Sequence, residues 1–156
     1  MEIKRKHTMY HSTIVDADPD TVWAEVRDPM KVVKIVSGAA AKNVHWAEGG
    51  APERVPSRYD FTLAFCDGLV QQEVAGRNEM ERSSTYRAVA PATGVSGYVA
   101  TIRVRPITNE RDRSYFEWSR ELTIADDADP EVVERIIGMM ENQADSVRDH
   151  FALRRT

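Results

Sequence analysis

The sequence has a single cysteine, Cys66, among its 156 residues. A disulfide within one chain and a zinc site built from several cysteines are therefore not expected. No run of 18 apolar residues occurs, so no membrane-spanning helix is expected either. Basic residues are not in excess, since 21 lysines and arginines stand against 25 aspartates and glutamates. Nucleic-acid-binding domains usually carry a basic surplus, so the charge argues against that class of partner.

The first residues, Met1 to Lys6, are charged, and no apolar stretch follows them, so we do not expect a secretory signal. A cytoplasmic protein is the expectation. The length is that of one ordinary domain, and 42% apolar residues suffice for a real core. The Gly- and Pro-containing segment 48–56 is a predicted loop. Residues 1–156 are therefore interpreted as a single domain.

Three Asp-Pro pairs predict the starts of helices: Asp18-Pro19, Asp28-Pro29 and Asp129-Pro130. Aspartate is a good N-cap, and proline is favoured at the first helical position. Short apolar segments follow the first two pairs, enough for about two turns each. After the third pair, apolar residues recur at helical spacing from Glu131 to about Phe151. This spacing predicts one long amphipathic helix at the end of the chain.

Between the second and third predicted helices, the period of apolar residues changes to two, which is typical of strands with one buried face. Asp67-Gly68 lies between two alternating runs and predicts a hairpin. Strands that are segregated from helices indicate an α+β fold with an antiparallel sheet. The seven predicted strands cover residues 7–15, 39–46, 58–65, 69–77, 83–89, 98–105 and 115–124.

A sheet of seven strands is too wide for one helix to cover if the sheet stays flat. We therefore expect the sheet to curl around the C-terminal helix and to bury its apolar face there. Because a strongly curved sheet cannot touch a helix everywhere, we expect a cavity between them. If the protein binds a small ligand, we expect a cavity of about 300 Å³ or more. A smaller cavity, together with no stabilisation by any apolar ligand, would count heavily against a binding function.

Four short motifs follow the opening strand in order, namely the segments 18–23, 67–74, 96–98 and 115–119, and the terminal helix closes the chain. This order of elements and motifs resembles the Bet v 1-like, or START-like, helix-grip fold of the SRPBCC superfamily. The chain looks most like the bacterial polyketide cyclase/dehydrase and lipid-transport family, over nearly all of residues 7–153. That family commonly carries a Trp-Pro pair in the second helix, where this chain has Met30-Lys31-Val32-Val33.

The resemblance implies a START-like ligand-binding domain. Its seven-stranded curved antiparallel sheet would wrap around a long C-terminal helix, with two short helices after the first strand. Fold alone does not define activity, because members of this fold bind or transform unrelated ligands.

Strand parity predicts which side chains face the cavity. The apolar set includes Phe65, and the same parity places the polar Gln72 and Arg120 on the inner face. On the terminal helix Met140 faces inward and Gln143 lies at the edge of the apolar stripe, with Asn142 on the opposite side. The candidate ligand-binding residues are Tyr59, Phe61, Gln72, Tyr86, Tyr98, Ile102, Phe116, Trp118, Arg120, Met140 and Gln143.

Arg120 has two interpretations. Inside the fold it must meet an anion, carbonyls or water, because burying an unpaired guanidinium is costly. Its planar fork would then fit a ligand carboxylate or enolate. Alternatively, it lies near the strand end and pairs with a surface carboxylate, as exposed arginines commonly do. The hydroxyls of Tyr59, Tyr86 and Tyr98 likewise either orient a polar ligand or belong to core aromatics.

Metal and nucleotide sites are not expected. His7 and His11 would lie about 13 Å apart along a strand, too far to chelate one metal. The segment Gly94-Val95-Ser96-Gly97 lacks the lysine and the following helix of a phosphate-binding loop. Cys66 lies beside a turn with no visible base and is predicted to be inert. No cofactor is therefore predicted.

Three acidic residues, Glu73, Glu117 and Glu121, fall on the outward parity, near Arg103 and Arg105. The simplest interpretation is that they lie on solvated strand faces. If one of them faced the cavity instead, burial would raise its pKa and make it a candidate general base.

Three functions remain open. The first is a binding module for a small hydrophobic or aromatic molecule, polyketide- or lipid-like, whose polar end meets Arg120, Gln72 and tyrosines. By resemblance, the alternative is a polyketide cyclase, aromatase or dehydratase without metal or nucleotide cofactor, with Arg120 and Tyr98 as catalytic residues that stabilise an enolate. The third is an interaction protein, such as a co-chaperone or a ubiquinone-binding accessory factor. An edge strand near the N-terminus would also allow a homodimer.

Overall fold

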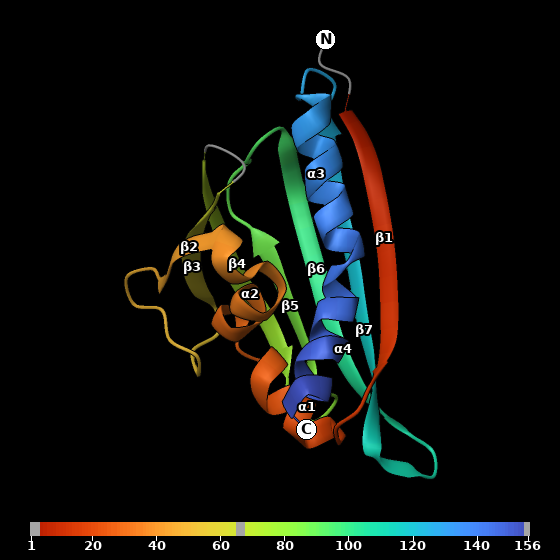
Figure 1. The fold of residues 1–156 in the computed structure, drawn as a ribbon. Coiled ribbons are helices and arrows are strands. Elements are labelled where there is room, and N and C mark those ends of the chain that lie inside the picture. Colours follow the sequence, from red (N-terminus) through yellow and green to blue (C-terminus); the bar gives the residue numbers. More distant parts are fainter. Residues whose placement is uncertain (1–3, 65–67, 155–156) are drawn as a thin grey trace.

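The computed structural model describes residues 4–64 and 68–154. Apart from the terminal helix, the elements follow the predicted order, with boundaries within a few residues of the expected ones (Figure 1). They are β1 (Lys4–Val15), α1 (Pro19–Val26), α2 (Pro29–Ser37), a 3₁₀ turn (Gly38–Ala40), β2 (Ala41–Trp46), β3 (Ser57–Leu63), β4 (Leu69–Asn78), β5 (Ser83–Ala88), β6 (Val95–Ile107), β7 (Glu110–Ala125), α3 (Pro130–Glu141) and α4 (Gln143–Arg154).

The strands form one antiparallel sheet in the order β1-β7-β6-β5-β4-β3-β2. Successive strands from β2 to β7 are neighbours, and β1 pairs with β7, so β1 and β2 are the two edges. Phe65, Cys66 and Asp67 lie outside the described residues, and with them the turn of the predicted hairpin. The strands on either side, β3 and β4, pair antiparallel as that hairpin requires.

Each Asp-Pro pair begins a helix, as predicted. The Asp18 carboxylate accepts a hydrogen bond from the backbone N–H of Thr21 at 3.1 Å. Asp28 accepts one from Met30 at 2.9 Å, and Asp129 accepts one from Glu131 at 3.0 Å. These bonds satisfy backbone N–H groups that a helix start leaves without an internal partner.

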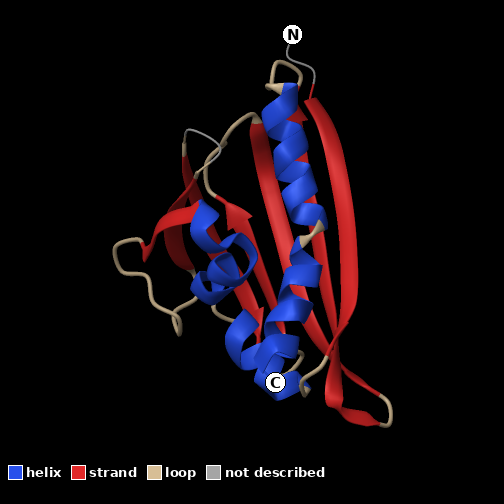
Figure 2. Cartoon of the chain, viewed as in Figure 1, coloured by secondary structure: helices blue, strands red, loops and turns tan. Residues whose placement is uncertain are grey.

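The long C-terminal helix is present as predicted, but it is interrupted once, because α3 ends at Glu141 and α4 begins at Gln143. Figure 2 shows this break as a short loop between the two helical halves. Asn142 has φ −99° and ψ −4° at the break. The nearby carbonyl of Met140 accepts a hydrogen bond from Nη1 of Arg120 at 3.3 Å. A side chain that inserts into the backbone ladder is a known cause of helix interruption.

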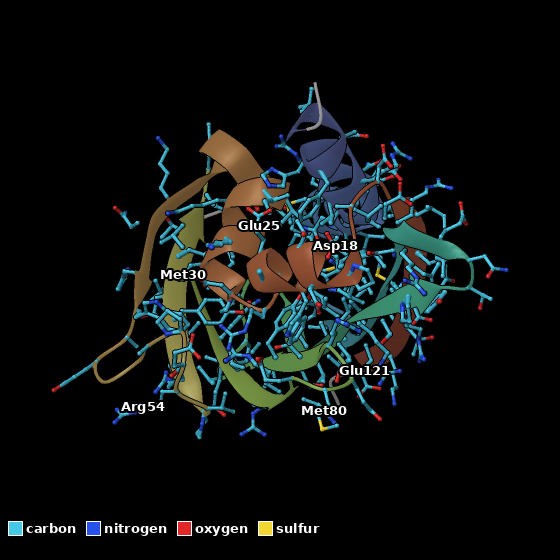
Figure 3. All side chains as sticks on the ribbon, turned by 90° about the horizontal axis from the view of Figure 1, so that it is seen from below. Asp18, Glu25, Met30, Arg54, Met80 and Glu121 are labelled. Atoms are coloured by element: carbon cyan, nitrogen blue, oxygen red, sulfur yellow. The ribbon has the colours of Figure 1, made fainter. Side chains whose placement is uncertain are left out.

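The helices lie on the concave face of the sheet, with α3 and α4 in front of β6 and β7 and α2 in front of β3 to β5 (Figure 1). Seen from below, the strands form a curved wall, and Met80 and Glu121 lie on its outer side (Figure 3). The core has two parts. One is built mainly on β6, β7 and the terminal helices around Trp118, and the other on β3, β4 and α2 around Tyr59.

Candidate ligand-binding site

The sheet and helices surround a cavity of about 120 Å³. Its wall contains side chains from both parts of the core, so the cavity lies between them. This volume is below the expected 300 Å³, because inward aromatic side chains and two methionines, Met139 and Met140, occupy much of the concave space. A cavity is present as predicted, but its volume is below the about 300 Å³ expected of a site for an ordinary small ligand, which counts against a ligand of that size.

Nine of the eleven predicted site residues line the cavity. The two exceptions are Phe116 and Arg120, which are buried behind the wall. Phe116 packs edge-on against Trp118, with ring centroids 5.9 Å apart. The nine lining residues are Tyr59, Phe61, Gln72, Tyr86, Tyr98, Ile102, Trp118, Met140 and Gln143.

Strand register explains why the polar side chains meet. Ala100 in β6 is opposite both Tyr86 in β5 and Arg120 in β7. Its small side chain leaves room for the larger groups on either side. Tyr98 lies two residues before Ala100 on the same face, and so it stands diagonally to Arg120. Three separate strands thereby bring two phenols and a guanidinium together on the concave face.

Arg120 is 3% exposed, so the interpretation that it pairs with a surface carboxylate is wrong. Its Nε–H donates to the hydroxyl oxygen of Tyr98 at 3.0 Å, and Nη2 donates to the amide oxygen of Gln143. The guanidinium also lies over the Trp118 ring, 3.8 Å from its centroid. The buried arginine thus meets oxygens and an aromatic face, as the other interpretation requires.

No carboxylate lies within ion-pair distance of Arg120 in the described part of the chain. Of the five N–H groups of the guanidinium, three have identified acceptors. Within the described residues its charge is compensated only by neutral oxygens and the Trp118 ring. The site therefore carries a net positive charge in a weakly polar environment.

Tyr86 and Tyr98 form a pair of hydroxyls in the cavity wall, 3.4 Å apart. The indole N–H of Trp118 donates to the Tyr86 oxygen at 2.8 Å. Each phenol oxygen therefore already accepts one hydrogen bond: Tyr86 accepts from Trp118, and Tyr98 accepts from Arg120.

A second polar pair is formed by Tyr59 and Gln72, which are opposite each other in β3 and β4. The Tyr59 hydroxyl donates to the Gln72 amide oxygen at 2.7 Å. Burial raises the pKa of Tyr59 well above its usual value, and burial followed by the field of Tyr98 does the same for Tyr86. Both phenols are therefore neutral hydrogen-bond donors at ordinary pH.

The three acidic residues on the outward parity are paired outside the cavity, as the simplest interpretation predicts. Glu73 binds Arg87 at 3.0 Å, Glu121 binds Lys6 at 3.4 Å and Glu117 binds Arg105 at 2.7 Å. Partial burial alone would raise the pKa of Glu117, but hydrogen bonds from Arg105 and Tyr10 lower it overall. A carboxylate in this environment stays ionised and is not poised as a general base.

Sequence reasoning missed the contribution of α2 and of the corner between α1 and α2. Val32, Val33 and Val36 line the cavity, and their helical spacing was a signal that could have placed them there. Arg27 also lines it, and nothing in its sequence context indicates this.

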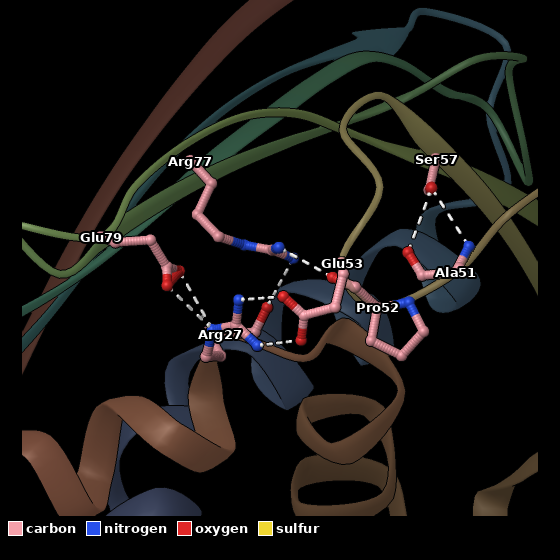
Figure 4. Close-up of polar contacts among 7 residues, drawn as sticks. All are labelled: Arg27, Ala51, Pro52, Glu53, Ser57, Arg77 and Glu79. Atoms are coloured by element: carbon pink, nitrogen blue, oxygen red, sulfur yellow. Dashed lines mark hydrogen bonds and ion pairs between the residues drawn. The ribbon is translucent and has the colours of Figure 1, made fainter.

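Figure 4 shows how Arg27 joins three parts of the chain. Its guanidinium binds Glu53 in the loop 48–56 at 2.9 Å and Glu79 after β4 at 3.0 Å. Hydrogen bonds to Glu53 and then Glu79 raise the pKa of Arg27. Arg77 donates to the backbone oxygens of Pro52 at 2.8 Å and Arg27 at 3.0 Å. The loop is thereby attached to the helical corner beside the cavity.

Within residues 4–64 and 68–154, no group of three or more histidine, cysteine, aspartate or glutamate side chains is arranged to hold a metal ion. None of the helices in this part of the chain is long and apolar enough to cross a membrane.

The architecture is that of the Bet v 1-like helix-grip fold. A norcoclaurine synthase variant of Thalictrum flavum, solved with a transition-state analogue, superposes with a TM-score of 0.70 at 17% identity and covers 99% of each chain. The protein XoxI of Bacillus cereus gives 0.74 at 19% identity, over 93% of this chain and 95% of its own. Norcoclaurine synthase of the same plant, in complex with dopamine and hydroxybenzaldehyde, superposes with a TM-score of 0.68 at 18% identity. The match covers 94% of this chain and 86% of the synthase chain.

The chain belongs to the polyketide cyclase/dehydrase and lipid transport family, whose model matches residues 6–152. This match confirms the resemblance found in the sequence. No curated protein matches the chain in sequence. At these identities the solved structures define the fold alone.

Proposed function

We propose that this protein binds a small hydrophobic or aromatic molecule in the cavity between the sheet and its helices. The observation that carries the proposal is the wall itself, in which aliphatic and aromatic side chains surround a few converging polar groups. Such a combination is typical of small-molecule sites, where apolar contacts supply affinity and the polar groups fix orientation.

The relatives support this proposal at the level of the fold. The family includes lipid transport proteins by its description. Norcoclaurine synthase, which shares the fold, has been solved with the aromatic molecules dopamine and hydroxybenzaldehyde. A cytoplasmic location and a homodimer stay predictions from the sequence.

The binding experiment uses the full chain and a panel of fatty acids, sterols, flavonoids, polyketides and single-ring aromatics. A ligand present at a hundredfold excess over its Kd should raise Tm by about 5–10 °C. Ala88 lines the cavity, so Ala88→Leu should fill part of the space and reduce this shift strongly. The matched control is Ala75→Leu, since Ala75 is exposed in the neighbouring strand.

Two results would contradict the proposal. One is a wild-type protein whose Tm does not move with any apolar ligand of the panel. The other is a shift that persists unchanged in Ala88→Leu, because such a ligand would bind elsewhere.

A second candidate is catalysis of a cyclisation or dehydration in the same cavity. One observation favours it: Arg120 donates to the oxygen of Tyr98, and Tyr98 lines the cavity. A charged donor behind a phenol makes its O–H a stronger donor to an oxygen that gains negative charge, such as that of an enolate. Tyr98 would contact the substrate, and Arg120 would act through it as a positioning residue.

Turnover of a reactive polyketide or other carbonyl substrate tests this candidate. Tyr98→Phe should lower kcat about tenfold or more while stability stays close to that of the wild type. Unchanged kcat would remove Tyr98 from the mechanism. Arg120→Ala should have a similar effect on kcat if the two residues act as one unit.

A further inference from the structure

We propose that the ligand is a single aromatic ring carrying a carbonyl or anionic oxygen, and that the Tyr86–Tyr98 pair donates one hydrogen bond to this oxygen. The inference rests on the proposed function and narrows it to one class of molecule. Three features carry it: the size of the cavity, the surplus of hydrogen-bond donors in its wall, and the buried charge of Arg120.

The size of the cavity limits the ligand. An apolar protein cavity of about 150 Å³ is known to hold one benzene molecule. The cavity described here has about 120 Å³, which is slightly less than that and leaves room for no more than about one ring. A fused polycyclic polyketide, a sterol or a long fatty acid needs several times this volume. Size therefore selects a single ring.

The tyrosine pair has one hydroxyl hydrogen too many. Tyr86 accepts from Trp118, and Tyr98 accepts from Arg120. Only one of the two O–H hydrogens can lie in the 3.4 Å contact between the hydroxyls. The described residues offer the other hydrogen no identified acceptor. A ligand oxygen that accepts it would satisfy the pair, because a buried donor without a partner costs about 1–3 kcal/mol.

Two glutamine side chains in the wall likewise have hydrogen-bond donors without an identified partner. The oxygen of Gln143 accepts from Arg120, and the oxygen of Gln72 accepts from Tyr59. In each case the amide oxygen is occupied, and the NH₂ group has no identified partner among the described residues. For Gln143 this orientation is fixed, because an arginine N–H needs an oxygen in front of it. The polar part of the wall thus offers mainly donors.

The charge of Arg120 strengthens this preference for a ligand that accepts hydrogen bonds. The guanidinium of Arg120 is cationic and buried directly behind Tyr98, and no carboxylate of residues 4–64 and 68–154 pairs with it. Electrostatic interactions are stronger in a weakly polar interior than in water. A carboxylate, phenolate or carbonyl oxygen at Tyr98 would be stabilised by this charge, whereas an ammonium group would be repelled. The site should therefore prefer an aromatic acid or aldehyde to an aromatic amine.

The first test compares five probes by isothermal titration of the full chain at pH 7.5: benzoate, benzaldehyde, toluene, benzylamine and palmitate. Benzoate and benzaldehyde should bind about tenfold or more tightly than benzylamine, which corresponds to about 1.4 kcal/mol. Toluene should bind between these limits, because it fills the cavity without a polar contact. Palmitate should neither bind nor displace benzoate.

The second test removes the Tyr98 hydroxyl and, in a separate variant, pairs the charge of Arg120, since both are expected to favour a ligand oxygen. Tyr98→Phe should weaken benzoate about tenfold and leave toluene within about twofold. Its control, Tyr10→Phe, removes a hydroxyl from a side chain that is exposed on the outside of the sheet. Gln143→Glu gives Arg120 a carboxylate partner, so it should weaken benzoate about tenfold and spare toluene. Its control, Gln71→Glu, adds the same charge on the outward face.

The outcomes separate this inference from the proposed function. Toluene, benzaldehyde, benzoate and benzylamine binding with equal affinity would overturn the donor argument, and tight binding of palmitate would overturn the size argument. Either result would leave a ligand-binding protein of another specificity. If none of the apolar probes binds and the broader panel fails as well, the proposed function itself falls.

Discussion

Two arginines of this protein, Arg27 and Arg120, experience opposite environments. The Arg27 side chain is 19% exposed and binds two carboxylates, Glu53 and Glu79. Arg120 is 3% exposed and binds none in the described chain. The accessible charge is thus fully paired, while the inaccessible one meets only neutral oxygens and an indole ring.

This difference is the reverse of what stability alone would favour. Exposed ion pairs contribute little, since water screens them. A buried cation is expensive, and a carboxylate partner would relieve part of that cost. We infer that Arg27 fixes the loop 48–56 against the helical corner, whereas Arg120 is held for the ligand. The predictions below probe the interior first and the exterior last.

The largest effect on stability is expected from removing the Trp118 ring, which packs against the guanidinium of Arg120. Trp118 is 1% exposed, and Trp118→Ala should lower the free energy of unfolding by about 3–5 kcal/mol through loss of packing and a new cavity. Urea denaturation measures this change. Trp46→Ala is the control, since Trp46 is only partly buried at the edge strand β2 and should cost less than about half as much. Equal losses at both positions would contradict the assigned core.

A second effect concerns alkaline pH. Burial raises the pKa of Tyr59 in the folded protein, whereas an unfolded tyrosine ionises near pH 10. The stabilisation is therefore fully present below about pH 10 and is lost as pH rises above it, at about 1.4 kcal/mol per pH unit. Tyr59→Phe should make the pH dependence of unfolding shallower by this slope, measured by urea denaturation between pH 9 and 11.

Phe61→Leu is the matched control for this slope. Phe61 stacks on Tyr59 with ring centroids 6.5 Å apart and has no titrating group. Its loss should lower stability at every pH and leave the alkaline slope of the wild type. If Tyr59→Phe keeps the wild-type slope, the phenol is not buried in the folded protein.

The elements of the fold follow from local chemistry, which explains why the sequence predicts them well. Asp18, Asp28 and Asp129 each precede a proline, and each forms the N-cap that this pattern indicates. Alternating apolar residues define the strands and their buried face. The break near Asn142 is different, because it coincides with a contact from Arg120 on another strand. Periodicity within the helix carries no information about that contact.

The sequence predicted which side chains lie on the concave face of the sheet, but not which of them touch the cavity. Parity placed Arg120 on the concave side, yet it cannot tell a residue that touches the cavity from one that lies behind Tyr98. The volume of the cavity could not be predicted from the sequence for the same reason. It depends on how Met139, Met140 and α2 fill the concave space, and these contacts join segments far apart in the chain.

The smallest effect is expected at Arg27, whose charge is paired and partly accessible to water. Arg27→Met keeps the apolar stem and removes the ion pairs, so the free energy of unfolding should fall by less than about 1 kcal/mol. In about 1 M NaCl the loss should shrink further, because the screening length falls to about 3 Å. Arg77→Met is the control, since Arg77 donates to two backbone oxygens and its loss should depend little on salt. A loss at Arg27 several times larger, or one insensitive to salt, would mean that the ion pairs of Arg27 behave as buried ones, and the contrast with Arg120 would fail.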